Sequence, residues 1–197
     1  MHHVGHSKDP EGESMRERVA ITLALSVAGT ALAGTFSELE SNNTIGTANS
    51  LGLFDVPGGS VVIDAYLGDN DVDWYSFTLA DTSSLAIFAA FSAGSSADGI
   101  LQLVTDSGDV IAFDDDSGVG FLPALQVESL GAGTYYLGMS GFGDVGSDSV
   151  DTDELADGIG HSEDFGYKLA VGFTIVPAPG ALALLGMGGL AMSRRRR

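Results

Sequence analysis

Short apolar segments recur through the middle of the chain, separated by Gly, Asp and Ser. They are rich in β-branched and aromatic residues, which is typical of strands. Apolar residues alternate along several of them, so that Tyr75, Phe77 and Leu79 share one predicted face. The predicted strands cover residues 61–67, 74–79, 85–91, 100–104, 110–113, 124–127, 134–140 and 167–174. Strands of this length and spacing predict an all-β fold, an antiparallel β-sandwich.

The same alternation predicts the core. Tyr135, Leu137 and Met139 fall on one face of their strand, and further along the chain so do the apolar residues from 167 to 173. Between two strands, residues 106–109 read Asp-Ser-Gly-Asp, which predicts a tight turn. Residues 143–163 carry many acids and few apolar side chains, so we expect a long exposed loop there.

The N-terminal end has a different composition. A short charged stretch after Met15 is followed by the mostly apolar residues 19–28 and by Ala31-Leu32-Ala33. This order is typical of a secretory signal peptide, so we expect a signal helix within residues 1–33, removed by signal peptidase after Ala33. Met15 is then the expected true start. The histidines among residues 1–14 leave open a metal-binding segment instead.

The C-terminal end, residues 176–197, has three parts. Val176-Pro177-Ala178-Pro179 comes first, an apolar run follows to residue 192, and Arg194, Arg195, Arg196 and Arg197 close the chain. About 20 apolar residues are needed to cross a bilayer core of roughly 30 Å, and this run approaches that length. Terminal arginines favour the cytoplasmic face. We therefore expect a hydrophobic helix that inserts either transiently or as a permanent inner-membrane anchor.

This tail resembles the PEP-CTERM sorting signal of bacterial exported proteins, with Ala178 where that family usually has Glu. The resemblance implies an exosortase as partner, a membrane enzyme that removes the tail and releases or attaches the body. It also implies export to the cell surface or beyond. Proteins with this signal accompany extracellular polysaccharide and biofilm matrix.

Charge separates the body from both ends. Of the 8 Lys and Arg in the chain, only Lys168 lies in the predicted body, residues 34–175, whereas most of the 27 Asp and Glu do. So acidic a surface repels nucleic acid and anionic membranes. It fits either carboxylates that collect divalent cations or a surface suited to salty surroundings. The chain has no Cys, so no disulfide contributes to its stability.

The body also resembles the bacterial pre-peptidase C-terminal domain. The matching pieces are residues 38–44, 71–77, 101–103, 114–116, 131–137 and 167–169, in that order. The resemblance implies a single jelly-roll-like β-sandwich of the kind found beside secreted enzymes. It also implies calcium, since members that bind the ion share it between an acidic lead segment and an Asp-x-Asp near an early strand.

Calcium takes six to eight oxygen ligands, and carboxylates and amide carbonyls supply them. The resemblance assigns this role, position by position, to six residues: Glu38, Glu40, Asn42, Asn43, Asp71 and Asp73. The alternative is that the asparagines cap a turn while the acids are solvated. A second acidic run, residues 114–116, fits an exposed turn better than a metal site, because side chains alternate along a strand.

Signs of catalysis are few. The body has no Cys and one histidine, His161, and the chain lacks a Gly-x-Ser-x-Gly or His-Glu-x-x-His motif. We predict an exported non-catalytic protein that calcium stiffens and that bridges to anionic exopolysaccharide. Two alternatives stay open. One is a calcium-dependent carbohydrate- or protein-binding module using Trp74 or Tyr66, although Trp74 fits packing better; the other is an accessory domain of a secreted hydrolase.

Overall fold

The computed structural model describes residues 32–94, 96–144 and 154–177. The expected signal helix, the start at Met15 and Ala31 of the expected cleavage site lie outside these residues. So do the C-terminal helix and most of the sorting motif, namely Ala178, Pro179, Arg194, Arg195, Arg196 and Arg197. Within the described part no helix is long and apolar enough to span a membrane.

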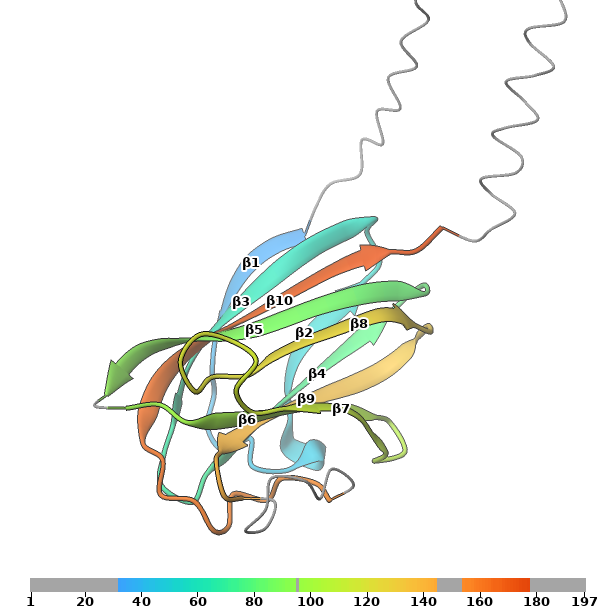
Figure 1. Cartoon of the computed structure of the whole chain (residues 1–197). Coiled ribbons are helices and arrows are strands. Elements are labelled where there is room, and N and C mark those ends of the chain that lie inside the picture. Colours follow the sequence, from blue (N-terminus) through green and yellow to red (C-terminus); the bar gives the residue numbers. More distant parts are fainter. Residues whose placement is uncertain (1–31, 95, 145–153, 178–197) are drawn as a thin grey trace, which may run out of the picture.

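Two five-stranded sheets pack face to face (Figure 1). The first sheet has the order β1 (Leu32–Ser37), β3 (Gly58–Leu67), β10 (Phe165–Ile175), β5 (Ser83–Gly94) and β8 (Ala124–Leu130). The second has the order β2 (Asn49–Phe54), β4 (Val72–Leu79), β9 (Gly133–Gly141), β6 (Gly99–Thr105) and β7 (Val110–Asp114). One 3-10 turn, η1 (Ile45–Thr47), precedes β2. The predicted all-β sandwich is confirmed.

Each of the eight predicted strands is present, but two further strands were not predicted. β1 and β2 are rich in small residues and contain Gly34 and Gly52, so neither carries a clear alternating pattern. Both are edge strands, and both pair in parallel, β1 with β3 and β2 with β4. The sheets are therefore mixed: the eight predicted strands pair antiparallel with one another, whereas these two edge strands pair in parallel.

The first two residues of β1, Leu32 and Ala33, pair with Gly59 and Ser60. Signal peptidase cleavage after Ala33 would remove this part of the strand and leave four of its residues. The boundary between the signal region and the body stays a prediction.

The core between the sheets consists of the side chains that the alternation selected. Tyr75, Phe77 and Leu79 of β4 are buried there, and so are Leu137 and Met139 of β9. The buried face of β10 is formed by Tyr167, Leu169, Val171 and Phe173. These side chains account for most of the aromatic packing between the two sheets, including the stacked rings of Phe54 and Phe173.

A second, smaller cluster lies on the outer face of the second sheet. Trp74 is buried there against Val72, Ile100, Val104 and Ala156. The indole therefore serves packing, as the sequence favoured. Ala156 and His161 are both buried, so the expectation of a fully exposed loop over residues 143–163 was wrong in the described part of that loop. Its residues cover the outward side of β4 and β9.

Both ends of the described chain meet at one end of the sandwich (Figure 1). Leu32 pairs with Gly59, and Thr174 of β10 pairs with the neighbouring Gly58. The acidic residues that follow β1 and precede β4 lie at the opposite end, because β1 ends there and β4 begins there.

We predict that replacing Gly138 with any larger residue destabilises the fold, because the position is closely packed. It lies opposite Trp74 in the β4–β9 pair, and a Cβ at this position would meet the indole ring at 2.7 Å. We expect Gly138→Val to destabilise the fold by about 1–3 kcal/mol through overpacking, measured by chemical unfolding. Gly34→Ala, which meets nothing within 4 Å, is the control and should unfold like the wild type.

Candidate metal centre

Three carboxylates converge where β1 ends and β4 begins. Single oxygen atoms of Glu38, Glu40 and Asp73 all lie within 4.8 Å of one another. The one basic residue in the described part of the chain, Lys168, forms an ion pair with Asp64, with 2.8 Å between Nζ and Oδ2. The three acids are therefore not neutralised by a side chain of opposite charge, and only protons or a cation can reduce their repulsion.

The backbone fixes this arrangement through the two neighbouring strands. The Glu38 amide donates to the Asp64 carbonyl at 3.1 Å and so extends the β1–β3 pairing by one residue. Further along, the Trp74 amide donates to the Asn42 carbonyl at 3.0 Å. This bond holds residues 38–44, called the lead segment below, against β4. Asp73 alternates with Trp74 and therefore shares the inward face of β4 with Tyr75.

A chain of hydroxyl groups joins the two buried carboxylates. Tyr75 donates from its hydroxyl to Glu38 Oε1 at 3.1 Å, and Tyr167 donates to Asp73 Oδ2 at 2.7 Å. The two tyrosine oxygens are 2.9 Å apart. Three contacts thus share only two hydroxyl protons, so a third proton on a carboxyl group is required for all three to be hydrogen bonds.

Two buried oxygens in this centre have no hydrogen-bond partner among the described residues: Asn42 Oδ1 and Asp73 Oδ1. Both residues are fully buried. The Asn42 amide nitrogen donates to Glu38 Oε1 at 3.1 Å, which leaves its carbonyl oxygen free. An unpaired buried acceptor is costly, and both of these belong to oxygen types that calcium prefers.

Burial raises the pKa of Asp73 to about 10, with Glu38 as the next cause through a hydrogen bond and charge repulsion. The pKa of Glu40 is also raised, first by burial and then by the charges of Asp71 and Glu38. Without a cation, Asp73 is therefore neutral at pH 7, and the third proton reverses the contact with Tyr167: the Asp73 carboxyl then donates to the Tyr167 hydroxyl, which donates to Tyr75. A bound cation would instead stabilise its ionised form.

Asn43 and Asp71, the other two residues of the predicted set, pair with each other beside the centre. Asn43 Nδ2 donates to Asp71 Oδ1, which also accepts from the Val72 amide at 2.9 Å. Asp71 Oδ2 accepts from the Gly68 amide at 3.3 Å. The Asp71 carboxylate therefore closes the turn between β3 and β4. The structure brings Glu38, Glu40, Asn42 and Asp73 together. Asn43 and Asp71 lie beside them and hold the turn before β4.

The acidic run 114–116 forms a turn, as the sequence favoured. Asp114 Oδ2 accepts from the amides of Ser117 and Ala124, at 3.0 and 2.8 Å. Its carboxylate is thus occupied by the backbone of the loop that follows β7.

The remaining singled-out side chains have structural roles or open surroundings. His161 Nδ1 accepts from the Glu163 amide, and Nε2, which then carries the proton, donates to the Asp71 carbonyl at 2.7 Å. Trp74 is only 1% exposed, at the floor of a depression lined by Ile45 and Ala156. Tyr66 is half exposed, and its amide donates to Glu38 Oε2 at 2.9 Å. The Tyr66 backbone thus adjoins the carboxylate cluster, while its ring lies on the outward face of β3.

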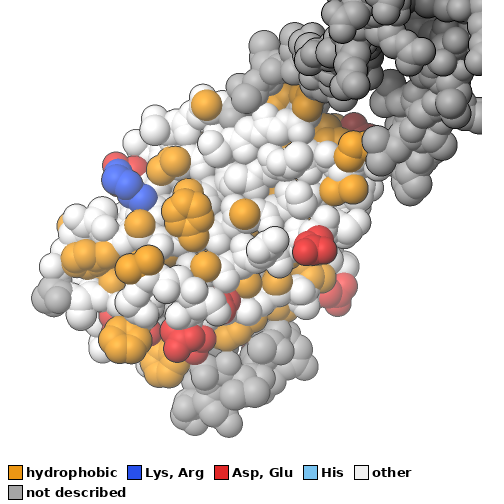
Figure 2. Space-filling view, turned by 45° about the horizontal axis from the view of Figure 1, so that its top comes forward, with side chains coloured by type: hydrophobic (Ala, Val, Ile, Leu, Met, Phe, Trp, Pro, Cys, Tyr) orange, Lys and Arg blue, Asp and Glu red, His pale blue; other side chains and the backbone are white. Residues whose placement is uncertain are grey.

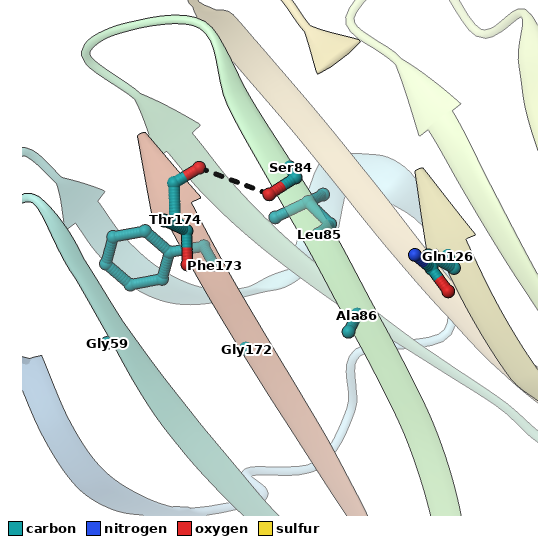
Figure 3. Close-up of a pocket in the computed structure, with 8 residues that line it drawn as sticks. All are labelled: Gly59, Ser84, Leu85, Ala86, Gln126, Gly172, Phe173 and Thr174. Carbon is teal, nitrogen blue, oxygen red and sulfur yellow. Dashed lines mark hydrogen bonds between the residues drawn. The ribbon is translucent and has the colours of Figure 1, made fainter. Parts of the chain in front are cut away.

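A shallow depression on the outer face of the first sheet offers a different environment (Figure 3). It lies over β10 where Gly59 and Gly172 lack side chains, and Ser84 Oγ donates to the Thr174 carbonyl at 3.4 Å along its edge. No titratable side chain lines it. The carboxylate cluster, in contrast, combines charge, burial and unpaired acceptors.

Sequence reasoning did not identify the hydroxyl groups of Tyr75 and Tyr167 as part of the centre. Alternation placed both rings in the core, which is correct, but it does not show that their hydroxyl groups reach the end of the sandwich. Tyr75 follows Asp73 by two residues and so shares its face, which is a usable signal. Nothing local marks Tyr167, because it comes from the other sheet.

Residues 71–141 match the sequence model of the family described as bacterial pre-peptidase C-terminal domain. The match runs from the turn before β4 to the end of β9, and it includes Asp71 and Asp73 but not the lead segment. It supports the resemblance carried by the sequence. Domains of this family are non-catalytic and often occur in secreted proteases. No curated protein sequence matches the chain.

Two solved structures are similar at low identity. The pre-peptidase C-terminal domain of collagenase from Bacillus anthracis is 17% identical, with a TM-score of 0.41 over 63% of this chain and 93% of that one. PliG from Aeromonas hydrophila, a periplasmic inhibitor of g-type lysozyme, is 12% identical, with a TM-score of 0.39 over 74% and 100%. We draw no conclusion about binding from either.

Asp73→Asn is expected to stabilise the protein in the absence of calcium. The Asp73 carboxyl ionises near pH 4 in the unfolded chain but only near pH 10 in the folded protein. Between these values the unfolded state alone loses the proton, so the free energy of unfolding of the wild type falls as the pH rises. The variant keeps the shape without that cost. Urea unfolding in chelator should show a gain over wild type that grows between pH 6 and pH 9 and exceeds about 1 kcal/mol at pH 8. A variant less stable than wild type at every pH would contradict this account.

Proposed function

We propose that this chain is an exported, non-catalytic surface or matrix protein whose β-sandwich binds calcium at the end distant from its two termini. The observation that carries the proposal is the pair of unpartnered buried oxygens, Asn42 Oδ1 and Asp73 Oδ1, among three mutually repelling carboxylates. A divalent cation satisfies both acceptors and the repulsion at once.

Glu38, Glu40, Asn42 and Asp73 would hold the ion. Calcium would supply positive charge to a cluster that otherwise needs a proton. The residues of the chain would then link the lead segment, β4 and, through Tyr167, β10 of the opposite sheet. Binding would stiffen the lead segment further, adding to the hydrogen bonds that already hold it, among them those of the Asn49 side chain to the Leu39 backbone.

A second candidate function is a calcium-dependent binding module. The half-exposed ring of Tyr66 favours it, since the Tyr66 amide is bonded to Glu38 and an exposed aromatic ring on the neighbouring face provides apolar contact for a sugar or peptide. This module would share the metal centre with the matrix protein. It would differ in showing saturable binding to a defined ligand that Tyr66→Ala abolishes.

Calcium is expected to raise the melting temperature of the full chain. A ligand that binds only the folded state stabilises it by RT ln(1 + [L]/Kd), about 2.7 kcal/mol at a hundredfold excess over Kd. Asp73→Asn and Asn42→Leu should lose this shift. Asp69→Asn removes a nearby exposed acid outside the centre and should retain it. A wild-type melting temperature that millimolar calcium leaves unchanged would rule out the metal centre.

Export and sorting make a separate prediction for the native host. The expected product begins at Gly34, ends between Val176 and Pro179, and co-fractionates with the extracellular polysaccharide until calcium is chelated. Intact mass and cell fractionation measure both properties. A membrane-bound body that retains Arg197 would instead establish a permanent anchor. If the protein stays in the matrix fraction when calcium is chelated, its location in the matrix does not depend on calcium.

A further inference from the structure

A second surface at the end of the sandwich that bears the acids is apolar and exposed. Val119 and Phe121 are 83% and 65% exposed, and Phe91 of β5 is 48% exposed. Together with Ala97 and Leu122 these side chains line a groove. Figure 2 shows apolar side chains gathered beside acidic ones at one end of this face. Contiguous exposed apolar surface on a highly charged protein marks an interaction site.

The loop that carries Val119 and Phe121 is held in a defined conformation. Its two ends are joined by the Asp114 carboxylate, which accepts from the amides of Ser117 and Ala124. Inside the loop the Gly118 amide donates to the Leu122 carbonyl at 2.9 Å, and a Cβ at Gly118 would meet that carbonyl oxygen at 2.5 Å. Hydrogen bonds thus close the backbone of this loop. The exposed surface of its apolar side chains contributes nothing to the free energy of folding.

Backbone hydrogen bonds fix the groove against both sheets. The Gly99 amide at the start of β6 donates to the Phe121 carbonyl at 3.1 Å. On the other side, the Ala89 amide of β5 donates to the Pro123 carbonyl at 3.0 Å. The groove therefore lies between β5, the start of β6 and the 115–123 loop, and it is preorganised for a partner.

Acidic side chains lie on the segments that form the groove, since Asp98 follows Ala97 and Asp115 and Asp116 belong to the same loop as Val119 and Phe121. Asp98 forms a bridge with Phe121, and its amide donates to Glu163 Oε2 at 3.3 Å. Its pKa is raised, first by burial and then by the charges of Glu163, Asp115 and Asp116. Asp98 is therefore close enough to each of these three carboxylates to be affected by its charge. Lys168, on β10 opposite Ala90, forms its ion pair with Asp64.

We propose that this groove binds a basic polypeptide segment in which apolar residues alternate with Lys or Arg, supplied by a partner protein. Val119, Phe121 and Phe91 would contact its apolar side chains, and the four rim carboxylates would contact its cations. The charge of the rim selects this occupant, because a second copy of this acidic chain or an anionic membrane would be repelled.

The test uses the full chain and an eleven-residue peptide of alternating leucine and lysine, with binding measured by fluorescence anisotropy over a range of salt concentrations. Wild type should bind it and should not bind the leucine–glutamate counterpart. Phe121→Ser and Val119→Ser should each weaken binding about tenfold, typical of a buried apolar contact. Asp115→Asn with Asp116→Asn should weaken it at low salt and flatten its salt dependence.

Matched controls lie at the opposite end of the sandwich. Leu53→Ser removes an apolar side chain of similar exposure, and Asp55→Asn removes an exposed acid. Both should bind like the wild type, and all variants should melt at the wild-type temperature in the absence of peptide. Absence of binding, or equal losses at Leu53 and Phe121, would overturn the proposal. Sedimentation that shows a dimer abolished by Phe121→Ser, with no peptide bound, would identify a second copy as the occupant and would also overturn it.

Discussion

The buried carboxyl group of Asp73 lies where both sheets and the lead segment meet. It lies on the inward face of β4, accepts a hydrogen bond from Tyr167 of the opposite sheet, and is close to Glu38 and Glu40 of the lead segment. Its environment is unfavourable to its own charge, since it is buried, surrounded by acids and only half satisfied. The end of the sandwich is therefore stable only when that charge is removed by a proton or balanced by a cation.

The distribution of charge extends this constraint to the whole body. With one lysine, already paired with Asp64, the described chain has no further basic side chain with which to neutralise its acids. Two acidic groupings persist at one end, one around a polar buried centre and one around an exposed apolar groove. The two groupings differ in the kind of cation that could reduce the repulsion between their carboxylates. The first encloses its oxygens and fits a small ion, whereas the second is open and fits a longer cationic segment.

How far the sequence predicts this structure depends on whether the signal is local. Alternation along β4, β9 and β10 identified the core because each strand carries its own pattern. β1 and β2 escaped because they are small-residue edge strands whose parallel partners are distant in the sequence. At the candidate metal centre, the clustering of Glu38, Glu40 and Asn42 was visible in the lead segment. The separation of Asn43 and Asp71 into a supporting pair, and the arrival of Tyr167, depend on tertiary packing that no local pattern encodes.

The position of β10 has a consequence for how the molecule comes into being. This strand is the last that the structure describes, yet it occupies the middle of its sheet, between β3 and β5. During synthesis or translocation that begins at the N-terminus, these two strands must wait without their shared neighbour until residues 165–175 emerge. Half of the sandwich then closes in one late step, because long-range pairing cannot precede the arrival of the pairing strand. A chain built in this order cannot complete its first sheet until nearly all of the described strands have been made.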